Sequence, residues 1–398
     1  MSSNNMSKTK IVNKSYKYRI YPSQEQIKFI EYNINSNRFI FNHVKATYEF
    51  YKKEVQRLNL PEIYANRKLF NMILKDLKKI YPFLKEADST CLQSAYENLI
   101  QAHKNVGGGD CWVKFKSTRN PVQSYKTKSN KDSIKIIDGK LKINKLKSPI
   151  KIKLSRKING KILSYTITRQ HNNQYFASIN LSKSIVIQNP KTGRRVGIDL
   201  GLKDFTTLSN GFKTGKIFLK KFDDRIARLN QELSCRVKNG KNWLKTKTKL
   251  ARTYQSKKNK ILNDLHWYSH KIVSDFDSIS VGNVNSKLGL SNKRLAKTTS
   301  DQHWYEFKRQ LEYKSDWYGK EFKLVDEKFT SKTCSSCGFQ LEEMDLSVKK
   351  WECPDCGSVH DRDVNAARNI RTVGATGIAF GKTNNIVGGL GIYGLHSP

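Results

Sequence analysis

Four cysteines late in the chain have the spacing of metal ligands. Two residues separate Cys334 from Cys337, fifteen separate Cys337 from Cys353, and two separate Cys353 from Cys356. Each close pair can place two thiolates on one turn, and two such turns make the tetrahedral sulfur cage that zinc prefers. A site closed by four thiolates has no open position for a substrate, so the pattern predicts a structural zinc.

Asp199 is a carboxylate in an unusual sequence context. It lies within the apolar run Val196–Leu200, which predicts a buried strand. A buried carboxylate is costly unless it is paired or binds metal, so Asp199 is a candidate ligand. The bland alternative is a partly exposed Asp near a strand end. The neighbouring glycines, Gly197 and Gly201, would allow a ligand or another backbone to approach closely.

Further acidic residues flank the cysteines on both sides. The stretch HDRDVNAA, which starts at His360, opens a predicted helix that contains Asp361 and Asp363. Acidic residues at a helix start are ordinary caps, so this motif becomes a candidate metal ligand only in combination with Asp199. Asp326 and Glu327 precede the first cysteine. Glu327 is either a solvated charge at a strand end or an active-site carboxylate.

The net charge of the chain indicates what kind of molecule a site built from these carboxylates would act on. The 398-residue chain has 74 Lys and Arg against 34 Asp and Glu, a net charge of +40. That excess destabilises the compact state by self-repulsion and indicates a polyanionic partner. Because basic residues are spread along the whole chain, a long nucleic acid that contacts several domains fits best. Candidate phosphate contacts are Lys52, Lys53, Lys114 and Lys116.

Carboxylates on a basic protein favour phosphodiester chemistry. Two divalent ions held by shared carboxylates can activate a water and stabilise the leaving oxygen. A membrane-surface function is the competing interpretation of the charge, but the sequence has no apolar run of transmembrane length. The polar N-terminus is no signal peptide, and seven cysteines without a disulfide framework indicate a reducing compartment. We therefore expect an intracellular protein with no membrane partner and no small-molecule substrate.

Hydrophobic periodicity predicts an α+β protein of several domains. A strand at 16–21 precedes a helix that Ser23 and Gln26 cap, and helical patterns continue to about residue 105. After a break at Gly107–Asp110, short strands from 112 to 182 indicate a β-barrel with a helical insertion after its first strand. Later strands are expected at 196–200, 205–208, 278–281 and 322–325, and helices at about 220–276, 302–318 and 363–371.

Several of these stretches match one family. VGIDLGLKDFTTLSNG, at 196–211, resembles the first RuvC motif of the TnpB and Fanzor proteins, relatives of the type V CRISPR nucleases. TSKTCSSCG, CPDCG and DRDVNAARNI resemble the family's zinc knuckle and last RuvC motif. YKYRIYPSQEQ, NRFIFN, WVKFKS, IKIIDGKLKINKL and HWYEFKRQLEYK resemble other parts of the family, so the likeness extends over about residues 16–371.

The resemblance implies a fold and a domain order. The expected fold is a wedge β-barrel with a helical recognition insertion, followed by an RNase H-like RuvC domain with an inserted zinc ribbon. The implied segments are an N-terminal arm and first wedge strand at 1–22, the helical insertion at 23–110, the wedge barrel at 111–190, the first part of RuvC at 191–328, the zinc-ribbon target-nucleic-acid-binding insert at 329–360, the last RuvC motif at 361–374 and a flexible tail at 375–398.

The resemblance also implies a function, that of an RNA-guided DNA endonuclease encoded by a mobile element. A guide RNA derived from the element would pair with one strand of double-stranded DNA beside a short motif, and one RuvC site would cut both strands. The implied magnesium ligands and catalytic residues are Asp199, Glu327 and Asp363, with Asp361 as the rival for the last position. Manganese could substitute for magnesium. The protein would act in the cytoplasm or nucleoid of a prokaryote, or in the nucleus of a eukaryotic or viral host.

The sequence departs from the family pattern at the middle RuvC motif. Gly282 stands where the family usually has Glu, and Asn283 replaces the acid that often follows. The site is then either inactive, which leaves a guided DNA-binding protein, or rearranged, as in Fanzor proteins and related bacterial members that carry the acid before the knuckle. Glu327 in EKFTSKTC matches the rearranged pattern, which we favour.

Two other function classes use the same features. A structural nucleic-acid-binding protein with a zinc ribbon would explain the charge and the cysteines, but not Asp199 in an apolar strand. A DDE-type transposase or integrase also uses three carboxylates on an RNase H-like fold, and it would cut without a guide RNA. Co-purification with one discrete RNA distinguishes these classes from a guided nuclease.

Overall fold

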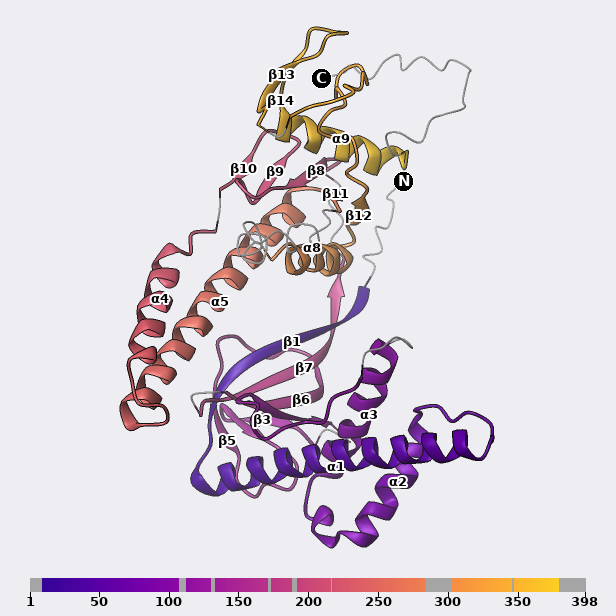
Figure 1. Cartoon of the computed structure of the whole chain (residues 1–398), viewed down its shortest axis with the longest axis vertical. Helices are drawn as coiled ribbons and strands as arrows, with labels where there is room; N and C mark the ends of the chain where they lie inside the picture. Colours follow the sequence, from indigo (N-terminus) through magenta and orange to yellow (C-terminus); the bar gives the residue numbers. More distant parts are fainter. Residues whose placement is uncertain are drawn as a thin grey trace, which may run out of the picture. The chain divides into compact units, whose positions relative to one another are not determined.

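The computed structural model describes residues 9–106, 112–129, 133–170, 173–187, 192–215, 217–283, 303–345 and 347–378. The chain forms two compact units (Figure 1). The N-terminal unit comprises residues 11–185, and the C-terminal unit comprises 1–10 and 186–398. The expected break at Gly107–Asp110 and most of the expected tail, 379–398, lie outside the described residues. The finer division into seven segments stays a prediction.

A seven-stranded sheet forms one half of the N-terminal unit, in the order β2-β6-β7-β1-β5-β4-β3. Its strands are β1 (Thr9–Tyr21), β2 (Gln123–Lys128), β3 (Lys135–Ile137), β4 (Lys140–Lys142), β5 (Ile150–Lys153), β6 (Lys161–Arg169) and β7 (Tyr175–Val186). Among the described residues no pairing joins β2 to β3, so the sheet is a half-barrel and not the closed barrel that we expected.

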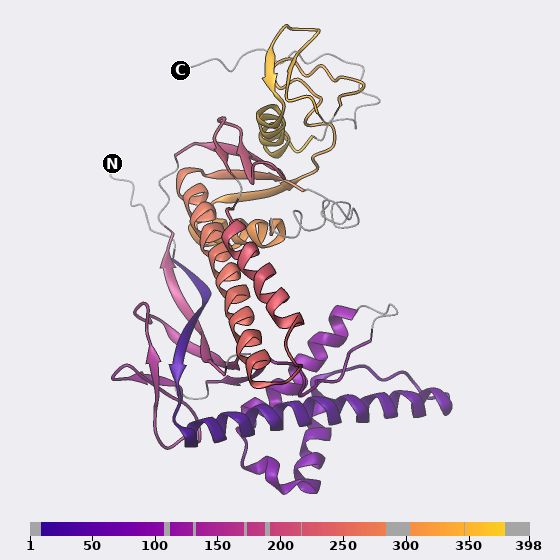
Figure 2. The ribbon, with the colours of Figure 1, turned by 60° about the vertical axis from the view of Figure 1, so that its left-hand side comes forward.

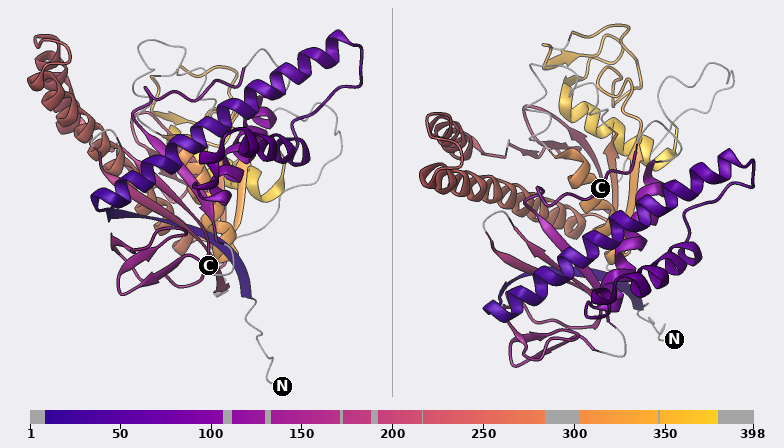
Figure 3. Two further views of the ribbon diagram at one scale, coloured as in Figure 1. Left: turned by 90° about the horizontal axis from the view of Figure 1, so that it is seen from below. Right: turned by 60° about the horizontal axis from the view of Figure 1, so that its bottom comes forward.

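Helices form the other half of this unit, in the insertion predicted after the first strand (Figure 3). They are α1 (Gln24–Arg57), α2 (Arg67–Ile80), the 3₁₀ helix η1 (Pro82–Lys85) and α3 (Ser89–Val106). The predicted capping box starts α1, because the Ser23 hydroxyl accepts from the Gln26 amide and the Gln26 side chain accepts from the Ser23 amide. The cap therefore fixes where the first strand ends and the insertion begins.

The strand expected at 112–116 is absent, which corrects the sequence analysis. Residues 112–117 have no regular secondary structure. The Lys116 amide donates to Asn42 Oδ1 at 2.8 Å, and Asn42 Nδ2 donates to the Lys116 carbonyl at 3.0 Å. A side chain of α1 thus satisfies the backbone groups that a neighbouring strand would have bonded. Alternation of apolar and basic residues could not reveal this competing partner.

The C-terminal unit contains a five-stranded sheet in the order β10-β9-β8-β11-β12. The strands are β8 (Arg195–Leu200), β9 (Thr206–Leu208), β10 (Lys213–Thr214), β11 (Ser278–Gly282) and β12 (Glu321–Val325). β8, β11 and β12 are parallel, whereas β9 pairs antiparallel with β8 and with β10. The mixed sheet confirms the hairpin and the later strands that the sequence predicts.

Helices cover both faces of this sheet (Figure 2). They are α4 (Lys220–Ser234), α5 (Lys241–Asp275), α8 (Trp304–Tyr318) and α9 (Arg362–Thr376). Val196 and Ile198 of β8 are buried in one core with residues of α5 and α8. Because side chains alternate along a strand, the opposite face of β8 presents Gly197 and Asp199. None of the described helices is long and apolar enough to cross a membrane.

Two glycines let α9 lie close against that opposite face. A Cβ built on Gly197 would lie 1.9 Å from the Ala367 carbonyl oxygen, and one on Gly374 would lie 1.8 Å from Ser280 Oγ. No side chain fits at either distance, so the α9 backbone lies directly against the β8 backbone at Gly197 and against the Ser280 side chain of β11 at Gly374. Of the two explanations that the sequence left open for Gly197, the structure shows the approach of another backbone. The beginning of α9 is thereby held beside the end of β8.

Candidate active site and cysteine cluster

Asp199 is the half-buried polar residue of an otherwise buried strand segment. The pKa of Asp199 is raised to about 7, chiefly by its removal from water and then by the negative charges of Asp363 and Glu327. The positive charge of Arg362 and a hydrogen bond from the Leu200 amide oppose this rise. Asp363 and Glu327 thus both lie close enough to Asp199 to disfavour its negative charge in the absence of a cation.

The start of α9 separates the roles of its two aspartates. Asp361 is the N-cap, and its Oδ1 accepts from the backbone amides of Asp363 and Val364, both at 3.1 Å. Lys213 Nζ donates to both carboxylate oxygens of Asp361, at 2.9 and 3.1 Å. Asp361 is therefore occupied by a cap and an ion pair, which leaves Asp363 as the acid of this motif that faces Asp199.

Glu327 follows β12 and reaches the end of the neighbouring strand. β11 and β12 pair in parallel, with Gly282 opposite Val325. A Cβ built on Gly282 would lie 3.0 Å from Glu327 Oε2 and 3.6 Å from Glu327 Cβ. The Glu327 side chain therefore fills the space that a side chain at position 282 would take. Asp326, by contrast, is exposed and accepts from the Lys328 amide at 3.2 Å.

Burial also raises the pKa of Glu327, and two neighbouring charges act on it. The ammonium group of Lys308, on α8, lowers the pKa, whereas the adjacent Asp326 raises it. Lys308 Nζ donates to Asn283 Oδ1 at 3.0 Å, directly after β11. A cation of α8 thus lies near the end of β11 and the Glu327 carboxylate together.

The three predicted carboxylates line one hollow of about 420 Å³ in the C-terminal unit. Four carboxylates and three cations surround it, together with hydroxyl and apolar groups. The charged side chains are Asp199, Asp204, Glu327, Asp363, Lys203, Lys349 and Arg362. Sequence reasoning missed Asp204, although it belongs to the quoted motif at 196–211. It also missed Lys349 and Arg362, for which spacing gives no signal.

This donor set fits a divalent cation. Magnesium prefers oxygen ligands and is commonly held by a small number of carboxylates together with water and substrate phosphate. The raised pKa of Asp199 reflects first its burial and then the proximity of Asp363 and Glu327, and a divalent ion would favour the charged carboxylate against both effects. The hollow therefore brings carboxylate oxygens together with cationic side chains of the protein.

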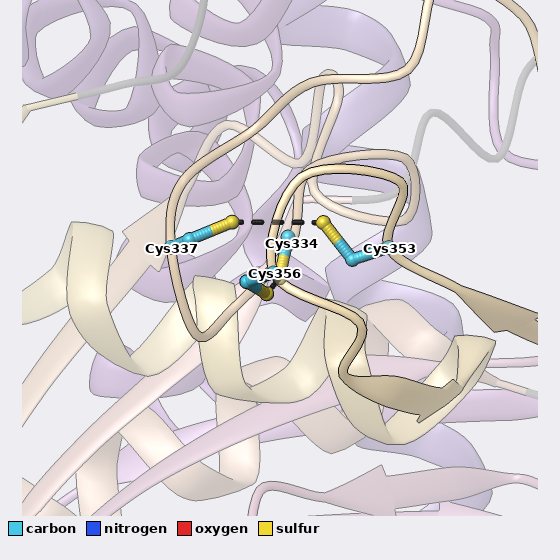
Figure 4. Close-up of side chains that lie close together, drawn as sticks. All are labelled: Cys334, Cys337, Cys353 and Cys356. Carbon is cyan, nitrogen blue, oxygen red and sulfur yellow. Dashed lines mark hydrogen bonds between the residues drawn. The ribbon is translucent and has the colours of Figure 1, made fainter.

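The four cysteines converge at the tip of the segment between β12 and α9 (Figure 4). Their sulfur atoms all lie within 4.8 Å of one another. Cys334 Sγ is 3.7 Å from Cys356 Sγ, and Cys337 Sγ is 3.6 Å from Cys353 Sγ. Zn–S bonds of about 2.3 Å in a tetrahedron would separate sulfurs by about 3.8 Å, so the cluster has zinc dimensions.

Two short strands complete this cysteine insert. β13 (Lys350–Glu352) and β14 (Val359–Asp361) pair antiparallel. Cys353 lies directly after β13, and His360 within β14 places its Nε2 3.0 Å from Cys334 Sγ. A ring N–H at that distance would stabilise a metal-bound thiolate. The insert is thus tied to the start of α9 through β14.

Two asparagines of α9 fix the turn that joins the carboxylate after β12 to the first cysteine. Asn365 Nδ2 donates to the Thr333 carbonyl at 2.7 Å, and its Oδ1 accepts from the Ser335 amide at 2.9 Å. Asn369 Nδ2 donates to the carbonyls of Thr330 and Thr333, at 2.7 and 2.6 Å. Both amides are buried, so these bonds are protected from water. The motif DRDVNAARNI thus both supplies a carboxylate and anchors the turn.

The predicted phosphate contacts lie in the N-terminal unit and differ in availability. Lys53 and Lys114 are exposed, and Lys52 is partly exposed near Glu62, at 3.8 Å. Lys116 is only partly exposed, its Nζ lies 4.2 Å from the centre of the Phe41 ring, and removal from water lowers its pKa. Lys116 therefore helps to attach its segment to α1, whereas a nucleic-acid contact of the others stays a prediction.

Three family models match separate parts of the chain. The OrfB_IS605 helix-turn-helix domain matches residues 6–55, the OrfB_IS605 model described as "Probable transposase" matches 165–289, and the "Cas12f1-like, TNB domain" matches 304–370. A protein of Acanthamoeba polyphaga mimivirus named TnpB-like protein L770 is 25% identical, over 90% of this chain and 73% of its own length. The chain belongs to the TnpB family.

Other relatives of this TnpB-family chain match over nearly their whole length. A Streptomyces pristinaespiralis protein named "Putative RNA-guided DNA endonuclease" is 29% identical over 93% of this chain and 91% of its own. An Escherichia coli protein named "Putative RNA-guided DNA endonuclease InsQ" is 27% identical over 92% and 94%. A Cas12f1 chain, solved in complex with sgRNA and target DNA, covers 90% of this chain and 99% of its own at a TM-score of 0.35 and 16% identity.

The different roles of Asp361 and Asp363 give a stability prediction. We expect Asp361→Ala to lower the free energy of unfolding by about 1 kcal/mol, because it removes the helix cap. We expect Asp363→Ala to leave stability unchanged or to raise it, because it relieves repulsion with Asp199. Urea unfolding in the absence of magnesium and manganese, with the cysteine cluster left intact, measures both by tryptophan fluorescence. A larger loss in Asp363→Ala than in Asp361→Ala would contradict the assignment.

Proposed function

We propose that this chain is an RNA-guided DNA endonuclease of a mobile element. Its guide RNA pairs with one strand of double-stranded DNA beside a short motif, and a single carboxylate site hydrolyses both strands. The convergence of Asp199, Glu327 and Asp363 on one hollow is the observation that carries the proposal. The net charge of +40 and the relatives named RNA-guided DNA endonucleases support the nucleic-acid partners.

The five-stranded sheet and its helices correspond in this proposal to a RuvC domain of RNase H-like fold. The mixed sheet, with three parallel strands next to an antiparallel hairpin, supports that assignment. The half-barrel and the helical insertion correspond to the wedge and recognition parts. They bind the guide RNA and the motif beside the target, with Lys52, Lys53 and Lys114 as candidate phosphate contacts.

Asp199, Glu327 and Asp363 would hold catalytic magnesium, which manganese could replace. Bound divalent ions activate water and stabilise the leaving oxygen of a phosphodiester. The chain's own contribution is to fix the three carboxylates on separate segments, within a hollow that also contains cations. β8 positions Asp199, α9 positions Asp363, and the turn held by the α9 asparagines positions Glu327.

A nuclease-inactive guided DNA-binding protein is the second candidate, because Gly282 lacks the acid usual in the family. The contact between Glu327 and the empty Gly282 side-chain position favours the active enzyme. A carboxylate stands at the expected point in space, although it comes from another strand. A solvated strand-end charge would have no reason to be half-buried there with a raised pKa.

A structural zinc at the four cysteines completes the proposal. The metal would hold the four cysteines of the insert together. The hydrogen bonds of the α9 asparagines would then keep the turn before Cys334 in place. Zinc then contributes folding energy and directs Glu327 without touching the scissile phosphate.

The guided function predicts RNA dependence. The ribonucleoprotein, isolated with its own RNA, should cut DNA that matches the guide, whereas RNA-free protein should cut nothing. Target binding should weaken steeply with salt, because each neutralised phosphate releases counterions. Sequencing the bound RNA and then reprogramming its guide segment provides the measurement. Equal cutting by the RNA-free protein would mean a guide-independent nuclease or transposase.

The carboxylate assignment predicts which substitutions abolish cutting. Asp199→Asn, Asp363→Asn and Glu327→Gln should each lower the single-turnover cleavage rate by on the order of 100-fold or more, with guided binding retained. Asp326→Asn is the matched control and should cut normally, because Asp326 is exposed. Binding without cutting by the wild-type ribonucleoprotein in magnesium or manganese would leave only the guided-binding function.

The same assignment includes a positional swap. Adding Gly282→Glu to Glu327→Ala should restore at least part of the lost activity, because both side chains occupy one place. The double variant cutting no faster than Glu327→Ala would argue against equivalence of the two positions.

The zinc assignment predicts one tightly bound zinc per chain. Cys337→Ser should lose the zinc and lower cleavage, because the turn that directs Glu327 loses its support. Cys235→Ser removes an exposed thiol outside the cluster and should change neither. Elemental analysis of each variant, beside its cleavage rate, gives the comparison; folded, active wild-type protein without zinc would refute the assignment.

A further inference from the structure

The cysteine insert also contributes a side chain directly to the hollow of carboxylates. Lys349 immediately precedes β13, and its carbonyl accepts from the Arg362 amide at 2.9 Å. That bond extends the β13–β14 ladder, in which Lys350 pairs with Asp361, by one step. Lys349 and Arg362 therefore stand opposite each other where the insert joins α9. The side chains of both line the hollow.

The Lys349 side chain makes no hydrogen bond or ion pair within the part of the chain that the structure describes. It is exposed, whereas Asp361 in the adjoining strand is paired with Lys213. Arg362 already interacts electrostatically with Asp199, whereas Lys349 keeps its charge for a partner from outside. The neighbouring residue offers an internal comparison. Lys350 is equally exposed but does not line the hollow.

The charges around the hollow suit a phosphodiester chain and not an isolated anion. Four carboxylates repel anions unless metal ions intervene, so a single phosphate would gain little at their centre. A DNA strand carries one charge at every nucleotide, and a phosphate beside the scissile one can reach a cation at the rim. A lysine on a flexible stem is a suitable point charge for such a contact.

We propose that Lys349 is a substrate-positioning residue that binds a backbone phosphate next to the scissile phosphodiester. The cysteine insert thereby becomes part of the site that it supports, and one segment both directs Glu327 and holds the DNA strand. This inference rests on the proposed nuclease function and names a contact of its substrate. Its effect falls on cleavage more than on target binding, since base pairing with the guide and many other phosphate contacts supply affinity.

The test compares Lys349→Met, Lys349→Arg and the matched control Lys350→Met in the ribonucleoprotein with its own RNA. We expect Lys349→Met to cut about 10- to 100-fold more slowly in single-turnover assays, with target affinity within about twofold of wild type. Lys349→Arg should recover most of the rate, and Lys350→Met should behave as wild type. All variants should retain the same zinc content, which excludes a collapsed insert.

Two results would overturn the inference: a Lys349→Met rate within about twofold of wild type, or an equal loss in Lys350→Met. Asp199→Asn separates this failure from failure of the proposed function. Cutting that needs Asp199 but not Lys349 refutes only the lysine contact, whereas cutting without Asp199 refutes the nuclease site. If the wild type binds without cutting, the salt dependence of target binding decides, and Lys349→Met should lower its slope by about one phosphate contact.

Discussion

Burial of Asp199 beside two further carboxylates, Asp363 and Glu327, is the constraint on which the C-terminal unit depends. Asp199, Glu327 and Asp363 come from three segments far apart in sequence. Burial and the charges of Asp363 and Glu327 raise the pKa of Asp199, and burial raises the pKa of Glu327 as well. Folding has to hold them together before any cation arrives. Close packing of α9 against the sheet keeps the three carboxylates together. The helix approaches β8 at Gly197 and β11 at Gly374, where only glycine fits.

The α9 helix is the element that unites the site. Its N-cap, Asp361, is neutralised by Lys213, its first turn carries Asp363, and its later asparagines bind the turn that follows Glu327. A single helix therefore positions one carboxylate directly, and a second through hydrogen bonds made by its buried asparagine side chains. The cysteine cluster lies in the chain between the turn that follows Glu327 and the start of α9, so it is joined directly to the segments that carry these two carboxylates.

Exchange of an acid between neighbouring strands has a simple geometric basis. β11 and β12 are parallel and adjacent, and position 282 is in register with Val325, two residues before Glu327. A glutamate side chain spans that short gap, so its carboxylate reaches the place that a β11 side chain would otherwise occupy. Loss of an acid from one strand is thus compatible with an intact carboxylate set, provided that the adjacent strand supplies another.

Local signals predicted most of the secondary structure. The Ser23 capping box, the long helices and the strands of the C-terminal sheet appear where sequence periodicity indicated. Failures arose where a distant partner intervened. The Asn42 side chain forms hydrogen bonds with backbone groups of the segment at 112–116, which was expected to be a strand. The expected barrel is an open half-barrel among the described residues.

The sequence by itself determined the cysteine quartet, the basic surface and an acid in an apolar strand, because spacing, composition and alternation are properties of the chain alone. It left Asp361 and Asp363 as rivals and gave Glu327 only by resemblance. Tertiary structure decided which acids meet, because strand register and the crossing of α9 over β8 join residues more than a hundred positions apart. It alone placed Lys349 beside those acids, because that proximity depends on how the insert folds back onto α9.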